Sequence, residues 1–273
     1  MDEETLNELS LWFSEYVQTF KSGDFEKDRN IVLKEEHTGR VRGEIREIGE
    51  SLGLGDEDLR LAEAMALFHD LGRFPQYARY ETFSDRRSCD HAVLSVKVLK
   101  ENRVLDALDP LEKDLILKPI SYHNRAALPE GESERCLLFS KLLRDADKLD
   151  IWAVLLDYYQ RREEGYQNEA LELDLPDLLD ISEDVYKDIM AGEIVKAKNL
   201  RSLNDFKLLQ ASWVFDINFW PALLAVRDRR YLERTREFLP NSEEIYRIFD
   251  LLQSRLEERI EAERPGSKIR LDG

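Results

Sequence analysis

Apolar residues recur at helical spacing along almost the whole chain, and this periodicity is the feature that most limits its fold. One stripe repeats every three to four residues, as one face of an α-helix requires, at Leu6, Leu9, Phe13, Tyr16 and Phe20. Alternating apolar and polar runs, which would indicate β-strands, are nearly absent. The 12 glycines and 8 prolines fall mostly between the periodic segments. The sequence therefore predicts an all-α protein.

Helix boundaries can be read from capping and stop residues. A second apolar stripe consists of Val41, Ile45, Ile48 and Leu52. Gly53 and Gly55 follow it and predict the end of that helix. Asp56 is suited to cap the next helix, which runs toward His69. Gly72, just past that helix, is a natural stop.

The same signals give the remaining elements. A polar loop is expected over residues 74–88, then helices over residues 90–100 and 111–123, a loop over 128–131 and a helix over 134–147. Ser133 is suited to cap the last of these helices. A connection is expected over residues 165–176. Ser242 belongs to a capping box for a final helix, and the tail from Pro265 is expected to fray.

The formal net charge of −17 limits the partners. Such a field repels duplex nucleic acid and anionic membrane surfaces, although a bound cation and a few arginines can still attract a small anion. No segment approaches the roughly 20 apolar residues that span a bilayer, and the acidic N-terminus lacks the features of a secretory signal. Cys89 and Cys136 are too few for a disulfide framework or a zinc knuckle. A cytoplasmic protein is expected, with its oligomeric state open.

The chain has only four histidines, and each falls in a different expected helix or at its end: His37, His69, His91 and His123. Each shares a helical face with apolar or small residues; His37, for example, lies four residues before Val41. Imidazoles that point inward from several helices are typical of metal sites in helical bundles. Any one of them, taken alone, is equally well explained as a buried residue satisfied by hydrogen bonds.

Asp70 and Asp147 lie beside apolar runs and add to this pattern. An ionised carboxylate in a core is costly unless it is paired or bound to a cation. A salt bridge to Arg73 or Arg144 is the simple structural explanation. Histidines and carboxylates from separate helices together favour a shared metal instead.

The segment His69-Asp70-Leu71-Gly72-Arg73, which follows a helix containing His37, resembles the His-Asp motif of the HD-domain metal-dependent phosphohydrolases. The segment from Leu143 to Asp150 is similar to the last motif of that family. The resemblance covers about residues 30–160. It implies an HD-domain-like helical bundle with additional C-terminal helices. The expected organisation is one domain over residues 1–273, in which an extension over 161–273 packs on a metal-binding core over 30–160.

The resemblance also implies the metal ligands. A first ion would be bound by His37, His69, Asp70 and Asp147, with Asp145 as the alternative last ligand. His91 and His123 match two further histidines of dinuclear members, in which Asp70 would bridge two ions. Mixed imidazole and carboxylate ligands suit Mn, Fe, Co, Ni or Zn better than Mg alone. The Gly-Tyr-Pro signature of the cyclic-dinucleotide branch is absent.

The expected activity is hydrolysis of a phosphate ester, with a nucleotide as the expected substrate, by a metal-activated water. Asp70 and Arg73 are the candidate catalytic residues, and Arg73 is also a candidate phosphate clamp because a guanidinium matches phosphate geometry. The other candidate substrate-binding residues are Arg86, Arg87, Asn124 and Lys148. Each of these also has a plain explanation as a solvated or ion-paired surface residue.

Two other functions fit the same residues. Some relatives of this fold use the same six ligands for oxygen chemistry, so ligand identity does not separate a di-iron oxygenase from a hydrolase. A non-catalytic regulator that binds a metal or a nucleotide is the third reading, motivated by the C-terminal half, to which no chemistry is assigned. Iron content and oxygen uptake would identify the oxygenase, and binding without turnover would identify the regulator.

Overall fold

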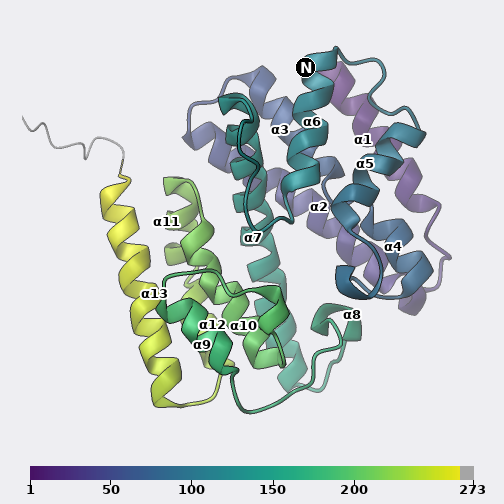
Figure 1. Ribbon diagram of the computed structural model, residues 1–273. Helices are drawn as coiled ribbons and strands as arrows, with labels where there is room; N and C mark the ends of the chain where they lie inside the picture. The colour runs from purple at the N-terminus through teal and green to yellow at the C-terminus, as the bar shows by residue number, and fades with distance from the viewer. Residues whose placement is uncertain (265–273) are drawn as a thin grey trace, which may run out of the picture. The chain divides into compact units, whose positions relative to one another are not determined.

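The computed structural model describes residues 1–264, and all of the regular elements among those residues are helices (Figure 1). This confirms the all-α prediction. The first helices are α1 (Glu3–Gln18), α2 (Phe25–Ser51), α3 (Asp56–Phe68), α4 (Arg73–Tyr80), η1 (Asp85–Arg87), α5 (His91–Glu101), α6 (Pro110–Tyr122) and α7 (Glu134–Glu163). They are followed by α8 (Glu169–Glu172), α9 (Glu183–Met190), η2 (Ala197–Asn199), α10 (Leu203–Ala211), η3 (Ser212–Asp216), α11 (Trp220–Asp228), α12 (Tyr231–Glu237) and α13 (Glu243–Ala262). Within the described part of the chain, none of these helices has the length and apolar character needed to cross a membrane.

The helices form two compact units. The first unit comprises residues 1–151 and 168–173, and the second comprises residues 152–167 and 174–264 of the described chain. Helix α7 contributes residues to both. The packing of residues 161–273 on the core as one domain stays a prediction. The tail from Pro265, which was expected to fray, lies outside the described residues.

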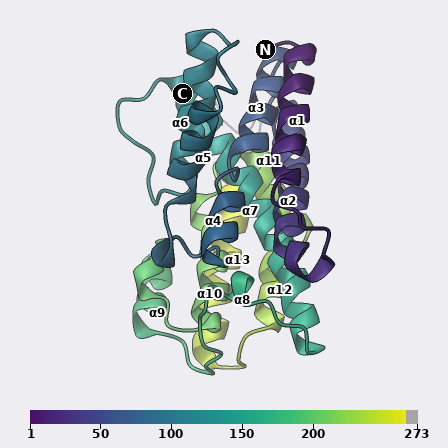
Figure 2. The same ribbon diagram turned by 90° about the vertical axis from the view of Figure 1, so that its right-hand side faces the viewer.

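The first unit is built around α3, which contacts α1, α2 and α6 (Figure 2). From Leu61 to Phe68 its residues are buried on every side, because this part of the helix is apolar apart from Glu63, which pairs with Arg42 and Arg46. Complete burial of each large apolar side chain there contributes about 1.5–3 kcal/mol. This central helix ends at Phe68, so the His69-Asp70 pair that follows it lies inside the unit.

Gly72 allows α5 to approach the turn after α3. A Cβ at this position would lie 2.3 Å from His91 O and 2.7 Å from Ser95 N, and both are backbone atoms. Gly72 N donates to Ser95 Oγ at 2.7 Å, and that hydroxyl lies 2.8 Å from His69 O. The φ of Gly72 is −66°, so the glycine is needed for this close approach and not for a left-handed helix stop.

The loop predicted over residues 74–88 is wrong for its first half, because residues 73–80 form α4. This helix buries only Phe74 and Gln76, and two helical turns are too short for a clear apolar stripe. The remainder of the segment is irregular apart from η1. Helix α7 also continues well past the expected end at Asp147, since Leu149, Trp152 and Leu156 extend its buried face.

Several predicted helix starts are confirmed. The side chain of Asp90 accepts hydrogen bonds from Ala92 N and Val93 N and so caps α5. In the second unit, Ser242 accepts from Ile245 N and caps α13. Helix α13 then packs its buried face against α9, α11 and α12. Residues 165–176 form a connection that contains only the short α8.

Candidate metal centre

The four histidines come from four helices of the first unit and are all buried. His37 lies within α2, His69 and His123 are the residues that end α3 and α6, and His91 begins α5. Their exposed fractions are 7% or less. Histidines at helix ends can be brought together because the ends of α3, α5 and α6 meet beside the middle of α2. The sequence-based expectation that inward-facing imidazoles gather at one place is borne out by this geometry.

His37 and His69 form a first pair around one oxygen of Asp70. Their Nε2 atoms lie 3.2 Å apart, and they are 3.5 and 3.7 Å from Asp70 Oδ2. Asp147, from α7, adds a second carboxylate: its Oδ1 lies 3.2 Å from His37 Nε2 and 3.5 Å from His69 Nε2. The structure thus brings Asp147, rather than the alternative Asp145, to the first pair.

His91 and His123 form a second pair around the other oxygen of Asp70. Their Nε2 atoms lie 2.9 Å apart, and they are 3.3 and 3.8 Å from Asp70 Oδ1. In each pair, the two histidine nitrogens and the Asp70 carboxylate oxygen are close enough to one another to share one ion. Asp70 therefore faces two possible metal positions, one through each carboxylate oxygen.

The Nδ1 atoms of all four rings face away from Asp70 and have partners of their own. His69 Nδ1 lies 2.8 Å from Ala66 O, and His123 Nδ1 lies 2.7 Å from Ile120 O. These two contacts go to backbone carbonyls. His37 Nδ1 lies 2.6 Å from Asp150 Oδ2. His91 Nδ1 lies at the same distance, 2.6 Å, from Asp85 Oδ2.

Because a carbonyl or carboxylate oxygen can only accept, each Nδ1 carries the proton and each Nε2 keeps its lone pair in the neutral ring. All four lone pairs then point toward Asp70. Imidazoles held in this way by outer partners are the usual arrangement of metal-binding histidines. The donor set and its orientation fit divalent metal.

Comparison with known protein families matches residues 35–152 to the HD domain. This segment is an HD domain. It runs from just before His37 to just after Asp150, so it contains the whole cluster. HD domains bind divalent metals, and the His–Asp groups of this one can hold such an ion. Neither the curated proteins nor the solved structures gave a match.

Two cations lie beside Asp70, one of them just before the matched segment and one within it. Lys34 Nζ, one helical turn before His37 in α2, is 2.6 Å from Asp70 Oδ2. Arg73 Nε is 3.4 Å from Asp70 Oδ1. The expected salt bridge between Asp70 and Arg73 therefore exists, and Lys34 adds a second one. Burial raises the pKa of Asp70, but the charges of Lys34, His69 and Arg73 outweigh it and hold the pKa well below the usual range.

The protonation of His37 is governed by three carboxylates. Burial and the nearby Lys34 ammonium lower the pKa of His37. Hydrogen bonds with Asp147, Asp150 and Asp70 outweigh both and raise it to about 10. Without metal, His37 is therefore an imidazolium that shares its second proton with the carboxylates around Nε2. A cation at this position would take the place of that proton.

The pKa values of the second pair, His91 and His123, are shifted downward, opposite to the shift of His37. Burial, followed by the charges of His91 and His69, lowers the pKa of His123 to about 3. Burial and the Arg73 charge also lower the pKa of His91, although Asp85 opposes them. Both rings are neutral near pH 7, which is the state that a metal ligand requires.

Arg73 is held by the loop that follows α4. Its Nη1 donates to Phe83 O at 2.6 Å, to Asp85 Oδ1 at 2.9 Å and to Gln76 Oε1 at 2.9 Å. The side chain is only 15% exposed. The arginine predicted to clamp phosphate therefore also organises the loop that carries Asp85.

The other predicted substrate-binding residues have different surroundings, and one of them, Asn124, lies 3.4 Å from Asp85 Oδ2, the oxygen that holds His91. Arg86 and Arg87 lie on η1 and are exposed. Asn124 donates to Asp90 Oδ1 at 3.0 Å. Lys148 is buried in α7. Arg144, considered above as a partner for Asp147, donates to His123 O and Arg125 O.

Sequence reasoning missed three residues of the site: Lys34, Asp85 and Asp150. Lys34 and Asp150 each lie three residues from a predicted ligand in the same helix, so helical spacing could have indicated them. Asp85 begins the three-residue η1 segment, which is too short for periodicity to point to a partner. Its role depends on the path of the loop.

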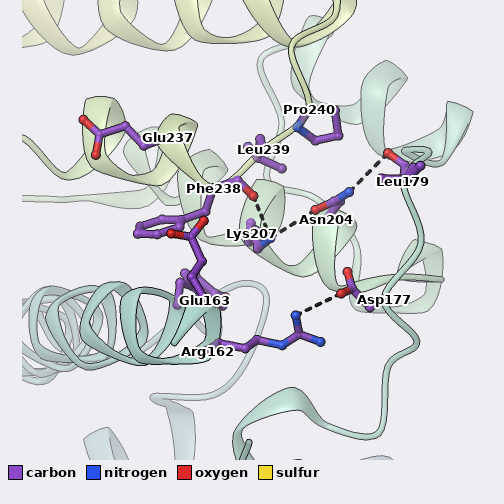
Figure 3. Close-up of a pocket in the computed structure, with 11 residues that line it drawn as sticks. Arg162, Glu163, Asp177, Leu179, Asn204, Lys207, Glu237, Phe238, Leu239 and Pro240 are labelled. Carbon is purple, nitrogen blue, oxygen red and sulfur yellow. Dashed lines mark hydrogen bonds and ion pairs between the residues drawn. The ribbon is translucent and has the colours of Figure 1, made fainter. Parts of the chain in front are cut away.

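The second unit has a cavity of its own, of about 320 Å³ (Figure 3). Lys207, from α10, donates to Phe238 O at 2.7 Å and lies 3.2 Å from Asn204 Oδ1. Arg162 pairs with Asp177 across another part of the wall, at 2.9 Å. Three of its charged side chains, those of Arg162, Asp177 and Lys207, are thus engaged with its own walls.

Proposed function

We propose that the HD domain hydrolyses a phosphate ester of a small substrate, with a nucleotide as the expected class, at a centre for two divalent ions. The observation that carries the proposal is the position of Asp70, whose two oxygens each face a separate pair of histidine Nε2 atoms. Bound ions at such a centre supply Lewis-acid polarisation of a phosphoryl oxygen and a water of lowered pKa.

The chain's own residues would then bind and orient the phosphate. Lys34 and Arg73 are the cations found against Asp70, and both are largely buried, with side chains 13% and 15% exposed. Charges in such surroundings act more strongly on an anion than solvated ones do. Together with bound divalent ions, they would offset the carboxylates of the cluster and attract a small anion, whereas the net charge of −17 disfavours duplex nucleic acid.

His123 is better suited to bind metal than to protonate a leaving group. Its pKa of about 3 leaves it neutral at pH 7, with the Nδ1 proton engaged by Ile120 O. An effective general acid has a pKa near the working pH. Both histidines of the second pair are therefore assigned to metal binding.

The test is phosphate release from a panel of nucleotides and simple phosphomonoesters, with Mn²⁺, Co²⁺ or Ni²⁺ added to metal-depleted protein. We expect turnover that needs metal and falls at least 100-fold in Asp70→Asn. The control is Asp106→Asn, which removes a surface carboxylate paired with Lys113 and Arg103 and should keep full activity. Metal-loaded protein that releases no phosphate, or that contains iron and consumes oxygen, would refute the hydrolase.

A further inference from the structure

The two histidine pairs are anchored by the same scheme but not equally firmly. In each pair, one ring donates to a backbone carbonyl and the other is held by a carboxylate: Asp150 for His37 and Asp85 for His91. Among the described residues, Asp147 contacts the Nε2 atoms of the first pair only. The second pair thus has fewer negative groups to hold a cation, and its orientation depends more on Asp85.

Asp150 is the more rigid of the two anchors. It lies in the middle of the 30-residue helix α7, and its side chain is 2% exposed. Arg40 Nε donates to Asp150 Oδ1 at 2.6 Å, and a second guanidinium nitrogen lies 3.3 Å from Oδ2. His37 is therefore held by a buried, charge-paired group that belongs to a continuous helix.

Asp85 is the more exposed anchor. Its side chain is 32% exposed and lies in the short η1 segment between α4 and α5. The position of Asp85 is set by α4: Arg73 Nη1 and Gln76 Nε2 each donate to its Oδ1 at 2.9 Å. Gln76 is fully buried and also donates to Ser88 Oγ and Cys89 O, so it ties the loop to α4 at several points.

We propose that Asp85 is a positioning residue for the second metal position, where it fixes His91 with Nε2 toward Asp70. A divalent cation then binds the first position, anchored by Asp150, independently of Asp85. Binding at the second position is weaker and depends on Asp85. This inference rests on the metal centre of the proposed function. It assigns the loop between α4 and α5 to the control of metal occupancy.

The physical basis is the effect of an outer carboxylate on a ligating imidazole. Such a partner fixes the tautomer and the ring orientation and raises ligand basicity, and its loss typically costs 10- to 100-fold in metal affinity. Asp85 and Asp90 also lie close enough to His91 to form a cation site of their own. If Asp85 bound an ion directly, His91 would have to use Nδ1, so the two roles predict different ring nitrogens at the metal.

The experiment measures metal stoichiometry and affinity in the full chain. Metal-depleted wild type, Asp85→Asn, Asp150→Asn and the surface control Asp106→Asn are titrated with Mn²⁺, and the bound ions are counted by elemental analysis. We expect two ions per wild-type chain. Asp85→Asn should lose 10- to 100-fold in affinity for the weaker ion only. Asp150→Asn should weaken the tighter ion by a similar factor.

The proposal is overturned if Asp85→Asn binds each of the two ions with the same affinity as wild type does. It is also overturned if Asp85→Asn loses the same factor of affinity at both positions. Because Asp85 also pairs with Arg73, its replacement can disturb folding, so a second measurement uses wild type. Long-range ¹H–¹⁵N spectra of the four imidazoles in Zn²⁺-loaded protein should show His91 protonated at Nδ1 and metal-shifted at Nε2. Coordination through Nδ1 would reject the positioning role.

These readouts do not depend on turnover. If Asp85→Asn binds both ions as wild type does while wild type hydrolyses phosphoesters, only the positioning role fails. If wild type binds two ions with the expected difference but releases no phosphate from any substrate, only the hydrolase fails.

Discussion

At the scale of single residues, the site depends on the two different nitrogens of each histidine. The outer Nδ1 is fixed by a carbonyl or a carboxylate, and the inner Nε2 is left for a cation. The same residue type consequently has opposite acid–base behaviour in one cluster. The pKa of His37 is raised to about 10 because carboxylates surround the ring, and that of His123 is lowered to about 3 because of burial and, after it, the neighbouring imidazoles.

The raised pKa of His37 predicts a pH-dependent metal affinity. A metal at the first position must displace the Nε2 proton, which metal-free protein retains up to pH about 10. Between pH 7 and 8.5, affinity should rise by up to about tenfold per pH unit. Chelator competition with Mn²⁺ at several pH values measures this slope. Asp150→Asn removes one of the carboxylates that raise the pKa, so its slope should be smaller, and a flat profile in wild type would contradict the prediction.

The same shift links pH to the stability of metal-free protein. A raised folded-state pKa means that the contribution of His37 is fully present below the ordinary value of 6.5 and is lost as pH rises toward about 10. Bound metal replaces the proton, so this alkaline loss should be smaller in loaded protein. The melting temperatures of metal-free and metal-loaded protein are measured between pH 6.5 and 9.5. If both fall equally with rising pH, the expected difference is absent and the prediction is wrong.

At the scale of elements, the spacing between α5 and the turn after α3 decides whether the two histidine pairs share Asp70. Gly72 permits this spacing, because a side chain there would meet the backbone of His91 and Ser95. Backbone atoms cannot move aside as the end of a flexible side chain can. The glycine of the His-Asp segment is thus explained by packing.

Replacing this glycine gives a direct test of the spacing. Gly72→Ala should lower the free energy of unfolding by about 3 kcal/mol through overpacking and should weaken the second metal position. Gly43→Ala is the matched control, because Gly43 lies in α2 and a methyl group there would have no neighbouring atom within 4 Å. Helix propensity should make that variant more stable by about 0.5–1 kcal/mol. Urea denaturation and metal titration measure both effects, and equal stabilities of the two variants would disprove the packing argument.

In the second unit, Lys207 connects α10 to the end of α12. Its ammonium donates to Phe238 O, a carbonyl just past α12, and lies 5.3 Å from the Tyr159 ring centroid. Lys207→Met keeps the length of the side chain but loses the charged hydrogen bond, so it should cost about 1–3 kcal/mol without changing metal stoichiometry. The exposed Lys187→Met on α9 should be nearly neutral. Urea denaturation should separate the Lys207→Met and Lys187→Met variants in stability, while the number of bound metal ions stays the same in both.

At the scale of the whole molecule, metal should act as a folding ligand of the first unit. The side chains that could hold it lie on α2 and α5, at the ends of α3 and α6 and, through Asp147, on α7, which meet only in the folded chain. At a free metal concentration of 100 times Kd, binding to the folded state alone contributes about 2.7 kcal/mol. Removal of metal with a chelator should therefore lower the melting temperature of wild type. His69→Ala should show little dependence on added metal, and an unchanged melting temperature in wild type would contradict a ligand role.

The chain determined by itself which residue types can do the chemistry and which of them face inward. Helical periodicity placed His37 and His123 on buried faces, because it is a local property of spacing along one helix, and the order of motifs along the chain indicated the HD domain. Only the tertiary structure decided which nitrogen faces Asp70 and which partner holds the other. Asp85 reaches His91 through an irregular loop, Lys34 reaches Asp70 from a neighbouring helix, and the approach at Gly72 sets the distance between the pairs. These contacts join residues far apart in the sequence, so they depend on how helices pack and not on the periodicity within any one of them.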